Sequence, residues 1–529
     1  MHTITKKELR QILASRFEND LHKKLCELPL PSCLKDIYKA ANRIKEAIEK
    51  NEKVAIVGDY DVDGIISCVI LSEFFDDIGF DYSVKIPNRF KDGYGLNEEI
   101  INELEDIKVI ITVDNGIAAL EAAKLCKERG IDLIITDHHT PLQTLPEAYA
   151  IINPKQKECN FPNIEICGAQ VAWYLIAALK EVCKLKYDMC KFLELLAIAI
   201  IADMMELRDL NRACVRRGIE CINKSKRAAF RVMKQYYQKD KFAIDNIGFL
   251  IAPLINSAGR MDDASVSYKF LHTKDLNKAM HYLEQIISFN ESRKDEEKQL
   301  FEESLRQIDE KQSCVIVGGE EWHEGVLGIV ASRLAKHFKK PSFVFSINED
   351  KLKGSARSVG KIDILNLISK ANPYLKNYGG HKGAAGLSLE LKDYENFKNL
   401  IQKESALIDK EEFLDTEEVL GVLEPSEIDF EMLEILESFE PFGYKNPRPY
   451  FVLENLKVKN KKLLGKEKKH LKLILVKDNK TIEALFFNFD KEPNLEESIN
   501  LVGSISKNEF RGLVTPQFII QELYYSLSS

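Results

Sequence analysis

An acidic cluster stands near the N-terminus of the chain. The segment "GDYDVDG" (58–64) places Asp59, Asp61 and Asp63 at alternate positions, directly after the apolar run "VAIV". Like-charged carboxylates repel one another, and burying a carboxylate without a partner is costly. The arrangement makes physical sense if a strongly positive group lies among them, which raises the question of what that group is and what chemistry it serves.

Further acidic and imidazole side chains follow other apolar runs. Asp114 closes "VIITVD", Asp137, His138 and His139 follow "DLIIT", and Asp203 stands near the end of "KFLELLAIAIIADMMEL". Taken singly, each of these is explained by a turn or by a structural histidine pair. Taken together, they collect carboxylates that no Lys or Arg within the three acidic loops neutralises. Divalent cations serve that purpose in proteins.

Carboxylate oxygens dominate this set of side chains, with one or two imidazoles beside them. Oxygen-rich sites suit Mg²⁺ and Mn²⁺, and imidazole favours Mn²⁺. Cysteine is absent from the set, which argues against structural zinc. The carboxylates suffice for two metal ions, which at roughly 3.5–4 Å apart bridge a water and a phosphoryl oxygen. The predicted reaction class is therefore metal-dependent hydrolysis of a phosphoester.

Two other kinds of phosphate chemistry are less well supported. The sequence contains no GxxxxGK[ST] loop and no GxGxxG after a strand, so nucleoside-triphosphate chemistry is disfavoured. The segment "DVDGI" resembles the DxDGT pattern of aspartyl-phosphate phosphatases, in which Asp61 would be the nucleophile. That alternative accounts for neither "TDHH" nor Asp59.

Short β-branched runs alternate with helical patterns from about residue 36. The predicted strands are "VAIVG" (54–58), "YSVKI" (82–86), "KVIITVD" (108–114), "DLIITD" (132–137) and "AYAIIN" (148–153). Continuous apolar strands separated by helices predict an α/β fold with a parallel sheet covered on both faces. Ligands bind such sheets outside the carboxyl ends of the strands, where the strand order reverses, and the acidic residues fall at these ends.

The length of 529 residues predicts several domains. We expect an N-terminal segment (1–35), the parallel-sheet domain with a helical extension (36–275), a long connecting helix (276–310), a second, smaller α/β domain (311–415) and a C-terminal β-barrel (416–529). Short strands with turn signals between them, such as "HLKLILVK" and "KTIEALFFNF", predict the barrel.

The composition favours a globular protein of the cytoplasm. No apolar run is long enough to span a bilayer, and the polar N-terminus is no secretory signal. Eleven cysteines are scattered singly, as is typical of free thiols in a reducing compartment. The net charge of −8 argues against a nucleic-acid binder. However, ten lysines against two acids between Lys457 and Lys480 indicate either a basic surface for a polyanion or a solvated hairpin.

The acidic motifs also carry a family resemblance. In order and placement, "GDYDVDG", "TVDNG", "TDHH" and "IADMMEL" resemble the motifs of the DHH phosphoesterases. Other blocks are similar to one branch, the RecJ single-strand exonucleases: "PNRFKDGYGLN" (87–97), "NSAGRMDDA" (256–264), "WHEGVLGIVASRL" (322–334), "GSARS" (354–358), "YGGHKGAAGLSL" (378–389) and "EPFGYKNPRPYF" (440–451). The resemblance implies a DHH domain, a DHH-associated domain and a C-terminal OB-fold-like domain.

The resemblance implies roles for individual residues. Two divalent cations, Mn²⁺ or Mg²⁺, would be held by Asp61, Asp63, Asp114, His138 and Asp203. Asp59 and His139 belong to the same motifs and would act on the scissile phosphate or support the ligands, with direct ligation left open. The substrate's first phosphates would be bound by Arg89, Arg260, Ser355, Arg357, Gly379, Gly380 and His381. Planar guanidinium groups and a glycine turn both suit phosphate oxygens.

The function implied is a 5′→3′ exonuclease that releases 5′-mononucleotides from single-stranded DNA during repair and recombination. Anchoring a terminal 5′-phosphate beside the metals would let only the first phosphodiester reach them. The implied partners are single-stranded DNA with a 5′ end, a single-strand-binding protein and a helicase, with no membrane. One alternative is a phosphodiesterase for short oligonucleotides or cyclic dinucleotides, against which the barrel argues. The other is a catalytically dead DNA-binding scaffold, against which the complete acidic set argues.

Overall fold

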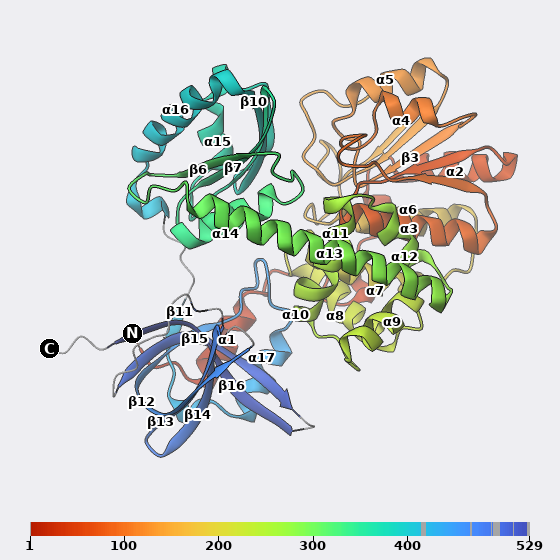
Figure 1. Cartoon of the computed structure of the whole chain (residues 1–529). Coiled ribbons are helices and arrows are strands. Elements are labelled where there is room, and N and C mark those ends of the chain that lie inside the picture. The colour runs from red at the N-terminus through yellow and green to blue at the C-terminus, as the bar shows by residue number, and fades with distance from the viewer. Residues whose placement is uncertain are drawn as a thin grey trace. The chain divides into compact units, whose positions relative to one another are not determined.

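The computed structural model describes residues 2–413, 419–465, 468–487, 489, 498–510 and 513–525. The chain forms two compact units, and Figure 1 shows the elements of each. The larger unit comprises Pro31–Asp203 and Cys221–Thr416, and the smaller comprises Met1–Leu30, Met204–Glu220 and Glu417–Ser529. No helix in the described ranges is long and apolar enough to cross a membrane.

The larger unit begins with a parallel sheet. Its strands are β1 (Val54–Val57), β2 (Tyr82–Lys85), β3 (Val109–Val113), β4 (Asp132–Thr136) and β5 (Ala150–Ile152), in the order β2-β1-β3-β4-β5. All neighbours run parallel, so this prediction is confirmed. The strand order reverses at β1, and the region outside the carboxyl ends of β1 and β3 is therefore the expected ligand site.

Helices pack around this sheet and extend beyond it. They are α2 (Ile37–Lys50), α3 (Val62–Ile78), α4 (Glu98–Glu103), α5 (Leu120–Glu128), α6 (Gly168–Val182), α7 (Leu193–Ala202), α9 (Ala228–Tyr237), α10 (Ile244–Asn246), α11 (Ala252–Met261) and α12 (Ser265–His272). A further helix, α8 (Asp209–Lys224), has residues in both units. Helix α3 is buried along most of its length and packs against α6 and α7, because its sequence is apolar nearly all round.

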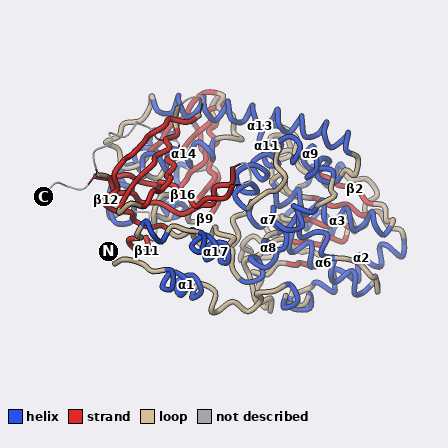
Figure 2. The backbone as a smooth tube through the Cα atoms, turned by 90° about the horizontal axis from the view of Figure 1, so that it is seen from below, coloured by secondary structure: helices blue, strands red, loops and turns tan. Residues whose placement is uncertain are grey.

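A second, mixed sheet follows the connecting helix α13 (Leu276–Leu305), which Figure 2 shows as one continuous element. The strands are β6 (Val315–Glu320), β7 (Ser342–Asn348), β8 (Lys351–Arg357), β9 (Asn377–His381) and β10 (Ala384–Glu390), in the order β6-β7-β8-β10-β9. Helices α15 (Ile364–Ser369) and α16 (Tyr394–Ala406) pack on one face. Helix α14 (Leu327–Phe338) packs on the other face, over β7 and β8 and the edge of β6.

The smaller unit contains the predicted barrel. Its strands are β11 (Val419–Val422), β12 (Tyr450–Leu464), β13 (His470–Lys477), β14 (Lys480–Phe486), β15 (Ile499–Phe510) and β16 (Leu513–Tyr525). β12 pairs with both β13 and β15, which closes the barrel and confirms the prediction. Helices α1 (Lys6–Ser15) and α17 (Phe430–Phe439) share the barrel's hydrophobic core. The N-terminal residues thus group with the C-terminal domain.

The apolar helix before Asp203 is shorter than its sequence pattern predicts. "KFLELLAIAIIADMMEL" indicates one helix to about residue 207, but α7 ends at Ala202. Met204 has a left-handed backbone with φ of 55°, which stops the helix. Asp203 is therefore the residue that follows the last turn, and residues 204–220 group with the barrel unit.

A buried ion-pair cluster ties together the helices that carry the acidic residues. The Arg227 guanidinium binds Glu73 on α3, and its Nε donates to Glu194 on α7 at 2.8 Å. It also donates to the carbonyl of Leu271 on α12 at 2.9 Å. The three charged side chains are 8–11% exposed. Removing the cation would leave both carboxylates buried without their main counter-charge, with only Lys191 still 3.7 Å from Glu73.

We therefore expect Arg227→Met to lower the free energy of unfolding by about 3–5 kcal/mol, the usual cost of breaking a buried ion pair. Urea denaturation measures this change. The exposed pair of Lys50 with Glu46 supplies the control, since Lys50→Met should cost no more than about 0.5 kcal/mol. Equal effects of the two substitutions would contradict the assignment of a structural role to Arg227.

Candidate metal centre and active site

The loop between β1 and α3 is folded tightly enough to hold three carboxylates. Asp61 caps α3, because its Oδ1 accepts the backbone N–H of Gly64 at 3.1 Å. A Cβ on Gly64 would lie 2.6 Å from the backbone nitrogen of Asp59, so only glycine allows this turn. Asp63 then falls in the first helical turn, and Asp59 is buried, with 4% of its surface exposed.

Asp63 is held by the N-terminus of a second helix. Its two carboxylate oxygens accept the backbone N–H groups of Gly168 and Ala169 at 2.5 and 2.9 Å, at the start of α6. The helix dipole and the free N–H groups of the first turn both favour a carboxylate there. Asp63 is only 1% exposed, so its orientation is set by this contact rather than by solvent.

Asp114 follows β3 in a left-handed conformation, with φ of 61°. Asn115 fixes the loop, because its amide donates to the carbonyls of Val57 and Val113 at 3.0 and 2.9 Å. Gly168 lets α6 approach closely, since a Cβ at that position would lie 2.6 Å from the Asp114 carboxylate. Neighbouring strands and one helix terminus thus bring Asp63 and Asp114 together.

Asp137 organises the two histidines that follow β4. Its Oδ1 accepts the backbone N–H groups of His138 and His139 and also contacts Nδ1 of His139 at 2.7 Å. Burial would raise the pKa of Asp137, but the bond and charge of His139 lower it. Conversely, burial would lower the pKa of His139, yet Asp137, Asp203 and Asp61 raise it to about 9. His139 is therefore a cation at neutral pH, with Nδ1 directed at Asp137.

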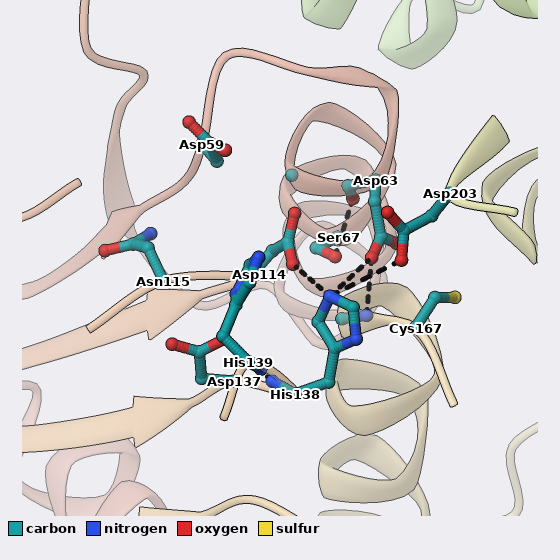
Figure 3. A network of polar contacts seen from close by, with 12 residues as sticks. Asp59, Asp63, Ser67, Asp114, Asn115, Asp137, His138, His139, Cys167 and Asp203 are labelled. Atoms are coloured by element: carbon teal, nitrogen blue, oxygen red, sulfur yellow. Dashed lines mark hydrogen bonds and ion pairs between the residues drawn. The ribbon is translucent and has the colours of Figure 1, made fainter. Parts of the chain in front are cut away.

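His138 lies at the centre of the acidic residues. Its Nε2 is 3.1 Å from Oδ1 of Asp114, 3.5 Å from Oδ2 of Asp203 and 3.7 Å from Oδ2 of Asp63. Figure 3 shows these three carboxylates directed at the imidazole ring. Burial, and then the positive charge of His139, lower the pKa of His138 to about 3. The ring is therefore neutral, although carboxylates surround its Nε2.

Several buried atoms of this cluster are suited to a cation. Within the described residues, His138 Nε2, Asp114 Oδ1 and Asp203 Oδ2 make no hydrogen bond. Ligand atoms lie within 4.8 Å of one another in three overlapping groups, which are Asp63-His138-Asp203, Asp59-Asp61-Asp114 and Asp114-His138-His139. Carboxylate oxygens with one or two imidazoles fit Mn²⁺ or Mg²⁺. Asp59, expected beside the ligands, thus lies close enough to share an ion with Asp61 and Asp114.

The carboxylates repel one another when no cation balances them. Burial, and then the negative charge of Asp61, raise the pKa of Asp63 to about 6. Burial and the charges of Asp63 and Asp61 raise the pKa of Asp203 to about 9. The pKa values of Asp59 and Asp114 are also raised, first by burial and then by neighbouring carboxylates. A pair of divalent cations would remove this cost.

A cavity of about 1130 Å³ adjoins the acidic cluster within the larger unit. Asp137 and His139 line one wall, and four of the predicted substrate residues, Arg89, Ser355, Gly379 and Gly380, also line it. The other three, Arg260, Arg357 and His381, are not part of this lining. Arg357 nevertheless donates to Ser355 Oγ at 3.0 Å.

The three predicted arginines lie close enough to affect one another. Burial, and then the charge of Arg89, lower the pKa of Arg260 to about 10. Burial and the same charge also lower the pKa of Arg357. Cations that are crowded and partly stripped of water favour an anion between them. The arrangement can therefore bind a phosphate group.

Strands β8, β10 and β9 of the second sheet supply another wall of the cavity. Strand register places Ser355, Gly386 and Gly379 side by side on one face, next to the row formed by Arg357, Ala384 and His381. A Cβ on Gly379 or Gly386 would meet no atom within 4 Å, so this face is flat and accessible. Backbone groups of this platform can approach a phosphate or sugar closely.

Several residues of the site were not among those predicted from the sequence. Tyr60, Tyr94 and Lys353 line the cavity, and the charge of Arg293, on the connecting helix, acts on Arg260. Tyr60 and Tyr94 lie inside the quoted motifs, and Lys353 directly precedes "GSARS", so motif position alone could have indicated them. Arg293 sits in a charged helix pattern without a distinguishing signal.

Family models match three regions of the chain. The DHH family N-terminal domain matches residues 53–200, the DHHA1 domain matches residues 311–408, and the RecJ OB domain matches residues 421–522. The chain is 32% identical to the single-stranded-DNA-specific exonuclease RecJ of Bacillus subtilis (strain 168), over 95% of this chain and 65% of that protein. It is 31% identical to the enzyme of the same name from Escherichia coli (strain K12), over 93% of this chain and 90% of that protein.

This chain belongs to the RecJ family. The fold agrees with a solved RecJ structure from Thermus thermophilus in complex with Mn²⁺, with a TM-score of 0.84, 27% identity and coverage of 98% of this chain and 75% of that one. The RecJ structure in complex with Mg²⁺ from the same organism has a TM-score of 0.77 and 25% identity, over 98% of this chain and 74% of that one. The chain spans 65% of the B. subtilis RecJ, so it accounts for less than two thirds of that relative.

Metal addition is expected to stabilise the protein in a pH-dependent way. The metal-free protein holds protons on Asp63 and Asp203 up to pKa values of about 6 and about 9, whereas the ordinary value is 3.8. The folded state thus binds more protons than the unfolded state between these values, and its stability falls as the pH rises through them. A bound cation replaces those protons, so we expect Mn²⁺ to raise the melting temperature most at about pH 8 and least below about pH 6.

Scanning fluorimetry with Mn²⁺ or with a chelator tests this pH dependence. Asp114→Asn should abolish the Mn²⁺ response. Asp81→Asn is the matched control at an exposed position and should retain it. A full response in Asp114→Asn, or a Mn²⁺ effect that grows as the pH falls, would contradict the metal assignment.

Gly168 should be intolerant of even a methyl group. In Gly168→Ala the new Cβ would meet the Asp114 carboxylate at 2.6 Å and push it from its position beside His138. We expect Mn²⁺ affinity to fall by about 10- to 100-fold, the usual effect of misorienting a ligand. Isothermal titration measures this affinity. Gly248→Ala, whose Cβ would meet its nearest neighbour at an ordinary 3.6 Å, should bind Mn²⁺ as the natural protein does.

Proposed function

We propose that this chain is a metal-dependent 5′→3′ exonuclease that releases 5′-mononucleotides from single-stranded DNA. The observation that carries the proposal is the unpartnered Nε2 of neutral His138 among three carboxylates, next to a cavity with an arginine cluster. One side of this site is suited to cations and the other to anions. A strand that ends in a 5′-phosphate satisfies both sides at once, through its terminal phosphate and its first phosphodiester.

The proposed metal ligands are Asp61, Asp63, Asp114, His138 and Asp203, with Asp59 close enough to contribute to the same ions. When bound, two such cations supply Lewis acidity to a phosphodiester and acidify water at the site. The protein's own contribution is to hold these side chains before substrate arrives, through the N-terminus of α6 and the Asn115 amide. This preorganisation lowers the cost of charge development during hydrolysis.

His139 is proposed to act on the reacting phosphate. Its Nδ1 is engaged by Asp137, which raises the pKa of the ring, so an imidazolium can donate from Nε2 into the cavity that it lines. A cation there would stabilise negative charge on a phosphoryl oxygen or protonate the departing oxygen. Asp137 orients the ring and keeps it charged, in the manner of a carboxylate–histidine pair.

The arginine cluster is proposed to set the direction of degradation. Arg89, Arg260 and Arg357, with Ser355, can bind a terminal 5′-phosphate, and the glycines of "GGH" leave room for the strand. With the phosphate end held there, the first phosphodiester is the one presented to the acidic cluster. His381 lies beside Ala384 and Arg357 in the sheet register and is proposed to extend this phosphate-binding surface.

The barrel favours a DNA strand over a smaller substrate. Lys457, Lys459 and Lys462 are exposed on β12, and Phe487 is 47% exposed with its ring 5.4 Å from His470. Lysines with an exposed aromatic ring are typical of a surface that tracks single-stranded nucleic acid. Of the three phenylalanines in this stretch, Phe486 and Phe489 instead pack against the core. A cyclic-dinucleotide or short-oligonucleotide phosphodiesterase has no need of such a surface.

The cellular setting follows from the proposed substrate. Unpaired strands arise in DNA repair and recombination when a helicase opens the duplex and a single-strand-binding protein keeps it open, so both are proposed partners. All eleven cysteines are free thiols, which supports a place in the reducing cytoplasm. A catalytically dead scaffold is not favoured, because the full set of acidic side chains converges on one site.

End-labelled oligonucleotides test both polarity and site. With Mn²⁺ or Mg²⁺, a 5′-labelled single strand should lose its label as a mononucleotide at once, while a 3′-labelled strand should shorten progressively. Asp114→Ala should reduce the rate by at least about 100-fold, because it removes a shared ligand. Arg231→Ala, an exposed arginine on α9, serves as the control and should keep its activity. Earlier release of nucleotides from the 3′ end would refute the polarity.

A further inference from the structure

Tyr60 occupies an unusual position between the two halves of the site. It lies between Asp59 and Asp61 in the β1–α3 loop, and its side chain lines the cavity. The guanidinium carbon of Arg89 lies 5.5 Å from the centre of the Tyr60 ring. The Tyr94 ring packs edge-on against the Tyr60 ring, with 6.1 Å between the ring centres. The loop that carries acidic ligands therefore also contacts an arginine of the phosphate clamp.

Arg89 differs from the other clamp arginines in what holds it. Arg260 donates to the carbonyl of Gly325 at 3.3 Å, and Arg357 donates to Ser355 and to the carbonyl of Ala356. In the part of the chain that the structure describes, no hydrogen bond or ion pair holds the Arg89 side chain. The face of Tyr60 is thus its main attractive contact, and the charges of Arg260 and Arg357 repel it.

The backbone of Tyr60 also fixes the helix that carries Arg260. A Cβ on Gly259 would lie 2.3 Å from the carbonyl oxygen of Tyr60, so α11 packs directly on this residue. The next residue after that glycine is Arg260. Tyr60 therefore contacts Arg89 through its ring and sets the position of Arg260 through its main chain.

We propose that Tyr60 is a positioning residue, which holds Arg89 against the repulsion of its neighbours so that the guanidinium meets a terminal 5′-phosphate. The inference rests on the proposed function, since it names what orients the phosphate clamp of the same site. It further implies that the β1–α3 loop carries both proposed metal ligands and the residue that orients the 5′-phosphate clamp. The attraction comes from the aromatic face, so the Tyr60 hydroxyl is dispensable and the ring is not.

The test compares single strands that carry a 5′-phosphate with the same strands that carry a 5′-hydroxyl. For Tyr60→Leu, the ratio of kcat/KM between the two substrates should fall by roughly 3- to 30-fold, mainly through KM, as expected for a lost cation–π contact. Tyr60→Phe should retain the ratio of the natural protein. In an Arg89→Ala background, Tyr60→Leu should cause no further fall, because both changes remove the same contact.

Two controls separate positioning from loss of structure. Tyr149→Leu removes a ring under the Lys39 ammonium, 5.0 Å away, outside the cavity lining, and should leave the ratio unchanged. A Mn²⁺ titration should give the same midpoint for Tyr60→Leu as for the natural protein. An unchanged substrate ratio in Tyr60→Leu would overturn the inference and leave the exonuclease proposal intact. An equal loss on both substrates with weakened Mn²⁺ binding would also overturn it, in favour of a purely structural role.

Discussion

The mutual repulsion of buried carboxylates around a neutral imidazole dominates this structure. His138 cannot offset the charge of Asp63, Asp114 and Asp203, because burial and the adjacent His139 cation keep its pKa low. Without compensation, the pKa values of the carboxylates rise and they take up protons. Hydrogen bonds from the N-terminus of α6 and within the loops after β3 and β4 hold the side chains in place. Bound divalent cations would offset the cost of this repulsion.

The rigid support comes from backbone features that tolerate little change. The N-terminus of α6 grips Asp63, and Gly168 allows that helix to come within contact of Asp114. Gly64 allows the β1–α3 loop to fold back on Asp59. Further from the site, Arg227 joins the helices that carry Asp63 and precede Asp203. Glycines and a buried ion triad each lower the stability of a fold when taken alone. They occur together here because the backbone must approach the acidic side chains closely and hold them in a fixed geometry.

The arginine cluster beside the cavity presents the complementary problem. Arg89, Arg260 and Arg357 repel one another, and the pKa values of Arg260 and Arg357 are lowered, so this region favours an anion as the acidic cluster favours cations. A nucleic-acid end carries closely spaced phosphates and can satisfy both regions only when it spans them. Under the proposed function, specificity for a strand end would follow from the separation of two unlike charge clusters, more than from contacts to any base.

The local pattern of the sequence determined the parallel sheet, the barrel and the acidic strand ends, because apolar β-branched runs and their following residues report on short-range structure. It also indicated that the carboxylates and imidazoles after β1, β3 and β4 would gather, since strand ends in a parallel sheet meet at one edge. The sequence could not show that α7 stops at Ala202, that residues 204–220 join the barrel unit, or that Arg89 lies over the Tyr60 ring. These features depend on helix termini, on left-handed backbone at single residues and on contacts between distant segments. Only the tertiary structure decides them, because burial and charge at each residue are set by neighbours that the local sequence does not contain.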